Sequence, residues 1–269
     1  MPELPEVEHA RRSFERWLWH KRIARVALPK TRVLRGSSVA ALRALAGHRV
    51  EEVRRHGKWL EVSFDRGLAL ALHLGMTGKL VREQPGREVR WSRARFVTDD
   101  GTVVHFQDQR LFGRLAAGPR DALEQALQLD RLGPDAWDAP LSADQLGARL
   151  SERKRALKEA LLDQTVVAGL GNIQATEALW KARLHPARPA SSLAPAELRA
   201  LVKAIHWTLA RTFRTIDGDE ITYLEEGGEN VFRVYGRAGK PCPRCGTTLE
   251  ARRLGGRASV FCPQCQPGG

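Results

Sequence analysis

The sequence lacks any long apolar run, and this excludes a chain that spans a membrane. Its longest apolar stretch, residues 68–76, is far shorter than the roughly 20 residues that a helix needs to cross a bilayer. The N-terminal segment carries Glu3 and Glu6 and has no hydrophobic stretch of the kind found in export signals. We therefore expect a globular, cytoplasmic protein.

Cysteine is almost absent, with four in the chain, all within residues 242–269. They form two pairs, Cys242 with Cys245 and Cys262 with Cys265, separated by 16 residues. This spacing is typical of a closed structural zinc site, in which four thiolates leave no open position for a water molecule. Two disulfides would require an oxidising compartment, and a redox Cys-x-x-Cys motif would not occur twice. We predict one structural Zn²⁺ ion.

Acidic residues are also in deficit, with 31 Asp and Glu against 44 Lys and Arg, which gives a formal charge of +13. Lys and Arg gain affinity for a polyanion by releasing counterions from its phosphates. Positive charge also serves solubility alone, so it indicates a nucleic-acid partner without indicating a reaction. Part of the excess lies in residues 237–269, where six basic residues accompany one acid, Glu250.

Hydrophobic periodicity predicts a β-rich first half and a helical second half. A helix is expected from Pro5 to about His20, and helical spacing returns from about Asp121. Strands are predicted over residues 23–28, 49–55, 59–64, 68–74, 95–98, 103–107 and 114–117. Helices are predicted over residues 143–150, 155–162, 174–182, 195–212 and 220–224.

These elements predict an α+β fold in three domains. Residues 1–133 are expected to form an N-terminal β-sandwich with an N-terminal helix, because many short strands at this spacing favour a sandwich or barrel. Residues 134–233 are expected to be helical. Residues 234–269 are expected to form a zinc-pinned hairpin whose two strands flank Gly255 and Gly256 and project Arg257.

The segment from Gly169 to Asn172 combines two glycines with the start of a predicted helix. It fails as a dinucleotide-binding fingerprint because Gln174 occupies the third glycine position and no βαβ unit surrounds it, so no nucleotide cofactor is expected. As a glycine turn it can present backbone N–H groups and the Asn172 amide to an anion. A plain joint between packed helices has the same local sequence, and the residues alone leave both interpretations open.

Three motifs in order resemble the formamidopyrimidine-DNA glycosylase/endonuclease VIII family across nearly the whole chain. Residues 1–8, MPELPEVE, resemble the N-terminal signature of its formamidopyrimidine branch, and residues 161–173 resemble its helix–two-turn–helix (H2TH) element. Residues 234–237, the four cysteines and Gln266 are similar to its zinc finger. The resemblance implies a base-excision-repair enzyme, a DNA glycosylase with AP lyase activity that acts on oxidised purines in double-stranded DNA. It also implies a monomer in the bacterial cytoplasm, associated with the nucleoid.

The resemblance explains the unusual N-terminus. Removal of Met1 would free Pro2 as a secondary amine, and an α-amine has a reference pKa near ~8, well below that of lysine. Pro2 is then the expected nucleophile, attacking C1′ of the damaged nucleotide to form an iminium. Glu3 is the expected proton carrier and Glu6 an electrostatic aid. Taken alone, both carboxylates also fit a helix N-terminus, where negative charge is favourable.

The family's other functional positions map onto residues spread along this chain. Lys58 and Arg257 are expected to contact phosphates and assist the elimination steps. Met76, Arg110 and Phe112 are expected to fill the gap left by a flipped nucleotide, with Arg110 and Phe112 on one face of an extended segment. The residues expected to grip the DNA backbone are Arg153, Lys154 and Asn172, with Lys158 as a neighbour.

The sequence departs from the family pattern in three places. Gln174 replaces a Tyr after the glycine turn, and residues 90–93 lack the usual His-x-His. Residues 213–234 differ from the loop that recognises oxidised purines and include an acidic stretch at 225–230. These departures keep two alternatives open: the same chemistry on oxidised pyrimidines or hydantoins, and a zinc protein that binds lesions without cleaving DNA.

Overall fold

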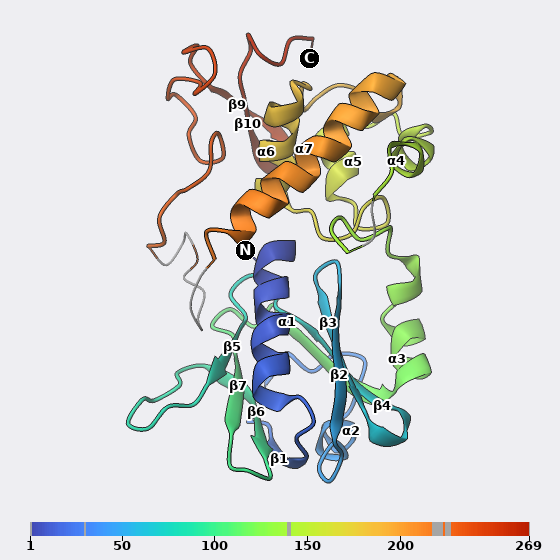
Figure 1. Ribbon diagram of the computed structural model, residues 1–269, viewed down its shortest axis with the longest axis vertical. Helices are drawn as coiled ribbons and strands as arrows, with labels where there is room; N and C mark the ends of the chain where they lie inside the picture. Colours follow the sequence, from blue (N-terminus) through green and yellow to red (C-terminus); the bar gives the residue numbers. More distant parts are fainter. Residues whose placement is uncertain (1, 30, 139–140, 217–222, 224–226, 269) are drawn as a thin grey trace. The chain divides into compact units, whose positions relative to one another are not determined.

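The computed structural model describes residues 2–29, 31–138, 141–216, 223 and 227–268, and the chain divides into two compact units (Figure 1). The first unit comprises Met1–Arg131 and Ile216–Gly227, and the second comprises Leu132–Thr215 and Gly228–Gly269. The helical segment and the cysteine-rich segment both fall in the second unit. The division into three domains at 133/134 and 233/234 stays a prediction.

The first unit is built from one long helix and two antiparallel sheets. Helix α1 (Leu4–Leu18) buries Phe14 and Trp17, and the Phe14 ring meets the Phe96 ring edge-on at 6.0 Å. One four-stranded sheet has the order β1 (Ile23–Ala27), β6 (Ser92–Thr98), β7 (Val103–Gln107), β5 (Lys79–Arg82). The other has the order β2 (Val50–His56), β3 (Trp59–Phe64), β4 (Leu68–His73), β8 (Arg114–Pro119). Alternation of buried and half-buried residues in β3 is the two-residue period that predicted the strand.

Two short elements of this unit were not predicted from the sequence. They are strand β5 and helix α2 (Val39–Arg43), and they are too short to show a hydrophobic period. Strand β6 also begins at Ser92, ahead of the predicted start at residue 95. A further helix, α3 (Arg120–Ala126), follows β8 where the predicted change to helical structure lies.

Among its described residues, the second unit contains four α-helices, one short 3-10 helix (Ala190–Ser192) and one hairpin. The helices are α4 (Ala143–Leu150), α5 (Leu157–Leu162), α6 (Asn172–Ala182) and α7 (Pro195–Phe213), and the hairpin strands are β9 (Glu250–Leu254) and β10 (Arg257–Phe261). The predicted helix at 220–224 lies, apart from Tyr223, outside the described residues. The mixed α+β class with a C-terminal hairpin is confirmed. No described helix is long and apolar enough to cross a membrane.

Candidate functional site

The N-terminus of α1 holds two carboxylates in a reciprocal cap. The Glu6 side chain accepts the backbone N–H of Glu3 at 2.8 Å, and the Glu3 side chain accepts the backbone N–H of Glu6. This capping box fixes where the helix begins. Pro2 is buried and Glu3 is only 1% exposed. The structure thus places Pro2 beside a buried carboxylate at a rigid helix start, whereas Met1 lies outside the described residues.

Glu6 should make stability depend on pH near neutrality. Burial, together with the neighbouring Glu3 carboxylate, raises the pKa of Glu6 to about 7. In the unfolded chain this carboxyl loses its proton near pH ~4.3, so between about pH 4.5 and 7 the folded state binds the extra proton and stability falls as the pH rises. In wild type we expect the free energy of unfolding to fall by about 1–3 kcal/mol over this pH range. Glu6→Gln, which mimics the neutral acid, should remove this fall. Urea unfolding of wild type, Glu6→Gln and the exposed control Glu51→Gln at several pH values measures it; an unchanged slope in Glu6→Gln would contradict the assignment.

A buried ion pair joins α1 to the turn that carries Lys58. The Arg55 Nε lies 3.2 Å from Glu8 Oε2, and Arg55 Nη1 donates to the carbonyl of Gly57 at 3.1 Å. Burial alone would raise the pKa of Glu8, but hydrogen bonds from Arg11 and Arg12 hold it below its usual value. A charged pair in such a position is sensitive to the loss of either partner. Glu8 and Arg55 therefore connect α1, which follows Pro2 and Glu3, to Gly57, the residue before Lys58.

His73 links the surroundings of Lys58 to a second turn. Burial, together with the positive charges of Lys58 and Arg114, lowers the pKa of His73 to about 4, so its ring is neutral at physiological pH. Its Nδ1 accepts the backbone N–H of Gly75 at 3.0 Å, which requires an unprotonated nitrogen. This bond holds the start of the turn that carries Met76.

Two turns, residues 74–78 and 108–113, pack against each other and are called the paired turns. Gly75 has φ +67°, and a Cβ at this position would lie 2.4 Å from the backbone carbon of Phe112. Only glycine allows so close an approach between the two backbones. The structure therefore brings together Met76 on one turn with Arg110 and Phe112 on the other.

Asp108 organises the paired turns from within. It is fully buried; its Oδ1 accepts the Thr77 hydroxyl at 2.7 Å and the Arg110 N–H at 3.2 Å, and its Oδ2 accepts the Gly113 N–H at 2.7 Å. The predicted extended segment at 110–112 is wrong, because Leu111 has φ +59°. Arg110 and Phe112 still meet, with the guanidinium carbon 5.1 Å from the ring centroid, and Phe112 is 51% exposed.

We expect Asp108→Asn to loosen the paired turns without unfolding the chain. An amide has one acceptor oxygen, so its N–H₂ would face either the Thr77 hydroxyl and Arg110 N–H or the Gly113 N–H, and one set of bonds is lost. The expected loss of stability is about 2–3 kcal/mol, typical of hydrogen bonds to a charged group. Urea unfolding measures it, with the exposed Asp99→Asn as the matched control. Equal stability of the Asp108 variant and wild type would contradict the role given to this carboxylate.

The glycine turn before α6 presents an unpaired side-chain oxygen. Helix α6 begins after Gly171, and the buried Oδ1 of Asn172 has no hydrogen-bond partner. Gln164 braces the turn, since its Oε1 accepts the Gly169 N–H and its Nε2 donates to the Leu170 carbonyl, both at 2.9 Å. Helix N-termini favour anions because their first N–H groups are unpaired and the macrodipole is positive there.

The two basic residues expected to grip the DNA backbone near this turn differ in how many partners they have within the protein. Arg153 is bound within the protein, with Nη1 3.1 Å from Asp163 Oδ2 and Nε donating to the Arg149 carbonyl at 3.0 Å. Lys154 is exposed. Lys154 therefore offers the more available cation, while Arg153 braces the preceding loop.

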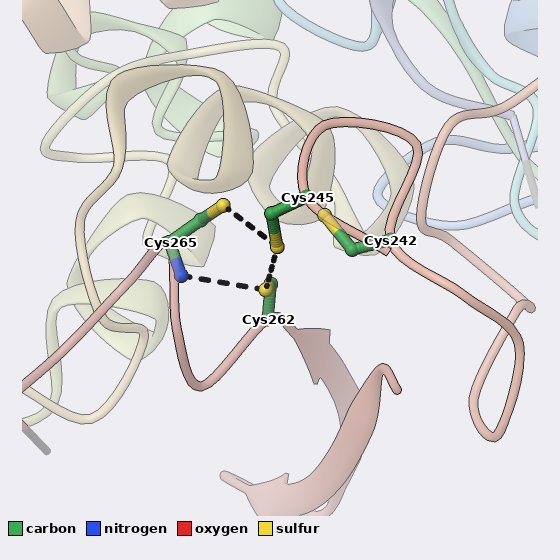
Figure 2. A group of neighbouring side chains, drawn as sticks. All are labelled: Cys242, Cys245, Cys262 and Cys265. Carbon is green, nitrogen blue, oxygen red and sulfur yellow. Dashed lines mark hydrogen bonds between the residues drawn. The ribbon is translucent and has the colours of Figure 1, made fainter. Parts of the chain in front are cut away.

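The four cysteines converge on one point (Figure 2). Their sulfur atoms lie within 4.8 Å of one another although they come from two separate turns. A Zn²⁺ ion bound at about 2.3 Å from each sulfur needs sulfur–sulfur separations near ~3.8 Å, which this cluster fits. Further groups orient the turns: the Trp180 Nε1–H points at Cys242 Sγ from 3.5 Å, and Gln266 Oε1 accepts the Cys262 N–H at 2.9 Å.

The hairpin beside the cysteines is held by α5. Lys158 is fully buried and its Nζ donates to the Ala258 carbonyl at 2.8 Å. The Glu159 carboxylate lies against the hairpin turn, 3.1 Å from a Cβ placed on Gly255. Arg257 is exposed at the first position of β10, directly after that turn. The predicted projecting arginine is therefore in place, whereas Lys158 supports the hairpin instead of facing solvent.

Comparison with known proteins agrees with this arrangement. Three family models match: "Formamidopyrimidine-DNA glycosylase N-terminal domain" at residues 1–115, "Formamidopyrimidine-DNA glycosylase H2TH domain" at 132–223 and "Zinc finger found in FPG and IleRS" at 239–268. A formamidopyrimidine-DNA glycosylase of Salinispora arenicola is 40% identical over 280 residues, covering 99% of this chain and 96% of the relative. The chain belongs to the formamidopyrimidine-DNA glycosylase family.

Solved structures of relatives share the whole fold. The MutM (Fpg) protein of Thermus thermophilus superposes with a TM-score of 0.85 at 36% identity, covering 100% of both chains. The Lactococcus lactis Fpg in complex with DNA containing an abasic site gives a TM-score of 0.87 at 27% identity, covering 99% of this chain and 100% of that one. The resemblance inferred from the three motifs is thereby confirmed.

One departure from the family pattern has a structural explanation. Gln174, in place of a Tyr, is buried, and its Nε2 donates to the Thr212 hydroxyl at 2.9 Å while its Oε1 accepts the Thr208 hydroxyl at 2.8 Å. These bonds tie α6 to α7 and give both polar ends of the amide a partner. The substitution therefore preserves the packing of the H2TH helices.

Glu177 is a buried positioning residue that the sequence analysis missed. It is fully buried, and its carboxylate accepts the backbone N–H groups of Arg233, Val234 and Tyr235 at 2.8–2.9 Å. It thereby fixes the segment that leads into the zinc finger. Asp108, Glu8 and Arg55 were also missed. The only sequence signal for these residues is a charge inside an apolar pattern, and that signal does not reveal the partner.

Proposed function

We propose that the protein is a bifunctional DNA glycosylase and AP lyase that removes oxidised purines such as formamidopyrimidine and 8-oxoguanine from double-stranded DNA. The observation that carries the proposal is the N-terminus, where Pro2 lies beside the buried Glu3 carboxylate at the capped start of α1. The proposal requires removal of Met1, since only then does Pro2 have a free amine. The DNA-bound Lactococcus lactis relative supports DNA as the substrate.

The Pro2 nitrogen attacks C1′ with its lone pair, the bond from C1′ to the damaged base breaks, and the base leaves with those electrons and a proton. Opening of the deoxyribose ring converts the C1′ adduct into an iminium, and Glu3 carries the proton to the ring oxygen. The iminium then accepts electrons from the C2′–H bond while the 3′ phosphate leaves by β-elimination. Loss of a C4′ proton expels the 5′ phosphate by δ-elimination, and water releases the sugar from Pro2.

The remaining residues hold the DNA for this chemistry. We assign Lys58 and Arg257 to the phosphates beside the lesion, and Lys154 and Asn172, with Arg153 as brace, to the backbone at the glycine turn. Met76, Arg110 and Phe112, on the paired turns, fill the gap in the base stack after the damaged nucleotide has flipped out. The zinc ion is structural and takes no part in the reaction.

Borohydride trapping tests the proposal. Protein lacking Met1 and incubated with an abasic-site duplex should form a covalent adduct when sodium borohydride reduces the iminium. Pro2→Gly should form far less adduct and retain DNA binding, because the substitution replaces the secondary amine by a primary amine, a weaker nucleophile, and leaves the DNA contacts in place. No adduct from correctly processed wild-type protein would refute the lyase and favour a zinc protein that binds lesions without cleaving DNA.

Oxidised pyrimidines or hydantoins are the second candidate substrates. The observation that favours them is the acidic stretch at residues 225–230, in a segment that departs from the family's oxidised-purine loop. Excision rates from otherwise identical duplexes carrying formamidopyrimidine, 8-oxoguanine or thymine glycol decide between the two. Faster excision of thymine glycol would assign the protein to the pyrimidine alternative.

A further inference from the structure

Trp91 is a large apolar side chain that the fold leaves in solvent. It is 43% exposed, and the other exposed large hydrophobic residues in the described part of the chain are Trp19, Val39 and Phe112. Trp91 directly precedes β6, within the segment 90–93 that lacks the family's usual His-x-His. Its indole ring therefore contributes exposed apolar area without filling the core.

The backbone at Trp91 is held in an unfavourable conformation. Its φ of +53° lies in the left-handed region, which is a rare conformation for a bulky residue with a Cβ. Such strain persists where surrounding structure imposes it, and it concentrates at functional sites. Here the imposing contact is the Trp91 carbonyl, which accepts the N–H of Asp108 at 3.1 Å. Arg93 Nε reinforces the link by donating to the Asp108 carbonyl at 2.7 Å.

Asp108 therefore connects Trp91 to the paired turns. Its backbone fixes Trp91, while its carboxylate fixes the turns of Met76, Arg110 and Phe112. Trp91 and Phe112 also resemble each other in having an arginine guanidinium beside the ring. The Arg90 guanidinium lies 5.3 Å from the Trp91 ring centroid, as the Arg110 guanidinium lies 5.1 Å from the Phe112 ring centroid.

We propose that Arg90 and Trp91 form a further DNA-contact site, in which Arg90 binds a phosphate and the Trp91 ring packs on the adjoining sugar or base. A guanidinium beside an aromatic face suits one nucleotide, because the charge matches the phosphate and the ring matches the apolar face. This inference rests on the proposed function, since it takes DNA as the partner of the paired turns. It assigns a contact to a segment that lacks the family's histidines.

Affinity measurements on exposed-tryptophan variants test the site. With a duplex carrying a non-cleavable abasic analogue, Trp91→Ala should raise the Kd roughly tenfold and Trp91→Phe should restore most of the affinity. Trp19→Ala, which removes another exposed indole of the same unit, should leave the Kd unchanged. Arg90→Ala should weaken binding and lower the salt dependence of log K by about one phosphate contact. A Kd of Trp91→Ala within about twofold of wild type would overturn the site.

A fourth variant separates contact from structure. Asn tolerates the left-handed conformation, so Trp91→Asn should melt at or above the wild-type temperature while binding DNA more weakly. A variant that loses both stability and affinity would show a structural role and overturn the proposal. Borohydride trapping at saturating duplex distinguishes the failure of this site from the failure of the proposed function. If wild type and Trp91→Ala both form the adduct and bind DNA with equal affinity, the Trp91 site alone is refuted. If wild type forms no adduct, the lyase is refuted.

Discussion

Glu3→Gln is expected to slow base excision by roughly two to four orders of magnitude while leaving DNA affinity nearly unchanged. Gln retains an oxygen that can accept the Glu6 backbone N–H, so the capping box and the start of α1 should persist. What the variant loses is a group that can carry a proton between Pro2 and the deoxyribose. Because Glu3 is only 1% exposed, water cannot readily take over the transfer.

Single-turnover excision from a lesion duplex measures the rate of base excision, and fluorescence anisotropy with a non-cleavable duplex measures the DNA affinity. Glu6→Gln is the matched control, since it makes the same carboxylate-to-amide change in the same capping box. The pKa of Glu6, at about 7, means that much of this residue is already neutral at physiological pH, so its variant should be the milder of the two. Equal losses in the two variants would show that the cap, and not proton transfer, is what Glu3 supplies.

The features that the sequence predicted well depend on neighbours along the chain. The four-cysteine cluster was predicted from the spacing of two Cys-x-x-Cys motifs, and the structure brings the four sulfurs together. The strand at Trp59–Phe64 and the helix at Ala143–Leu150 were predicted with their observed bounds because each shows a clear period. Short β5 and α2 have no such period, since the sheet and the core specify them.

The features that were missed depend on partners distant in the sequence. Glu8 meets Arg55 across 47 positions, and Asp108 meets Thr77 across 31. A buried acid is recognisable only once its donors are placed, and nothing local to Asp108 shows that it would join two turns. Gln174 is the reverse case: it broke a family pattern, yet Thr208 and Thr212 of α7 satisfy its amide. The family resemblance thus nominated the candidate site residues, while the structure revealed the buried groups that orient them.

Loss of the cysteine cluster is expected to have the second large effect. We predict that Cys262→Ala, or removal of zinc by a chelator, melts the β9–β10 hairpin and abolishes DNA binding. A structural zinc ion contributes about 10–16 kcal/mol of apparent binding free energy, and an isolated two-stranded hairpin is at best marginally stable. The residues of β9 are exposed or half-buried, so the strand has little core of its own to replace the metal.

Melting of the hairpin would also destabilise α5, which carries the buried Lys158. Lys158 is fully buried, and unfolding of β10 would remove the Ala258 carbonyl that its ammonium group bonds at 2.8 Å.

The control is Arg257→Ala, which leaves all four thiolates in place. This variant should keep its zinc content and melting temperature while its DNA affinity falls, because the role proposed for this exposed guanidinium is to bind phosphate and not to stabilise the fold. Zinc content, near-ultraviolet circular dichroism and anisotropy separate the two effects. Undiminished DNA binding by chelated protein with verified metal loss would show that the hairpin does not grip DNA.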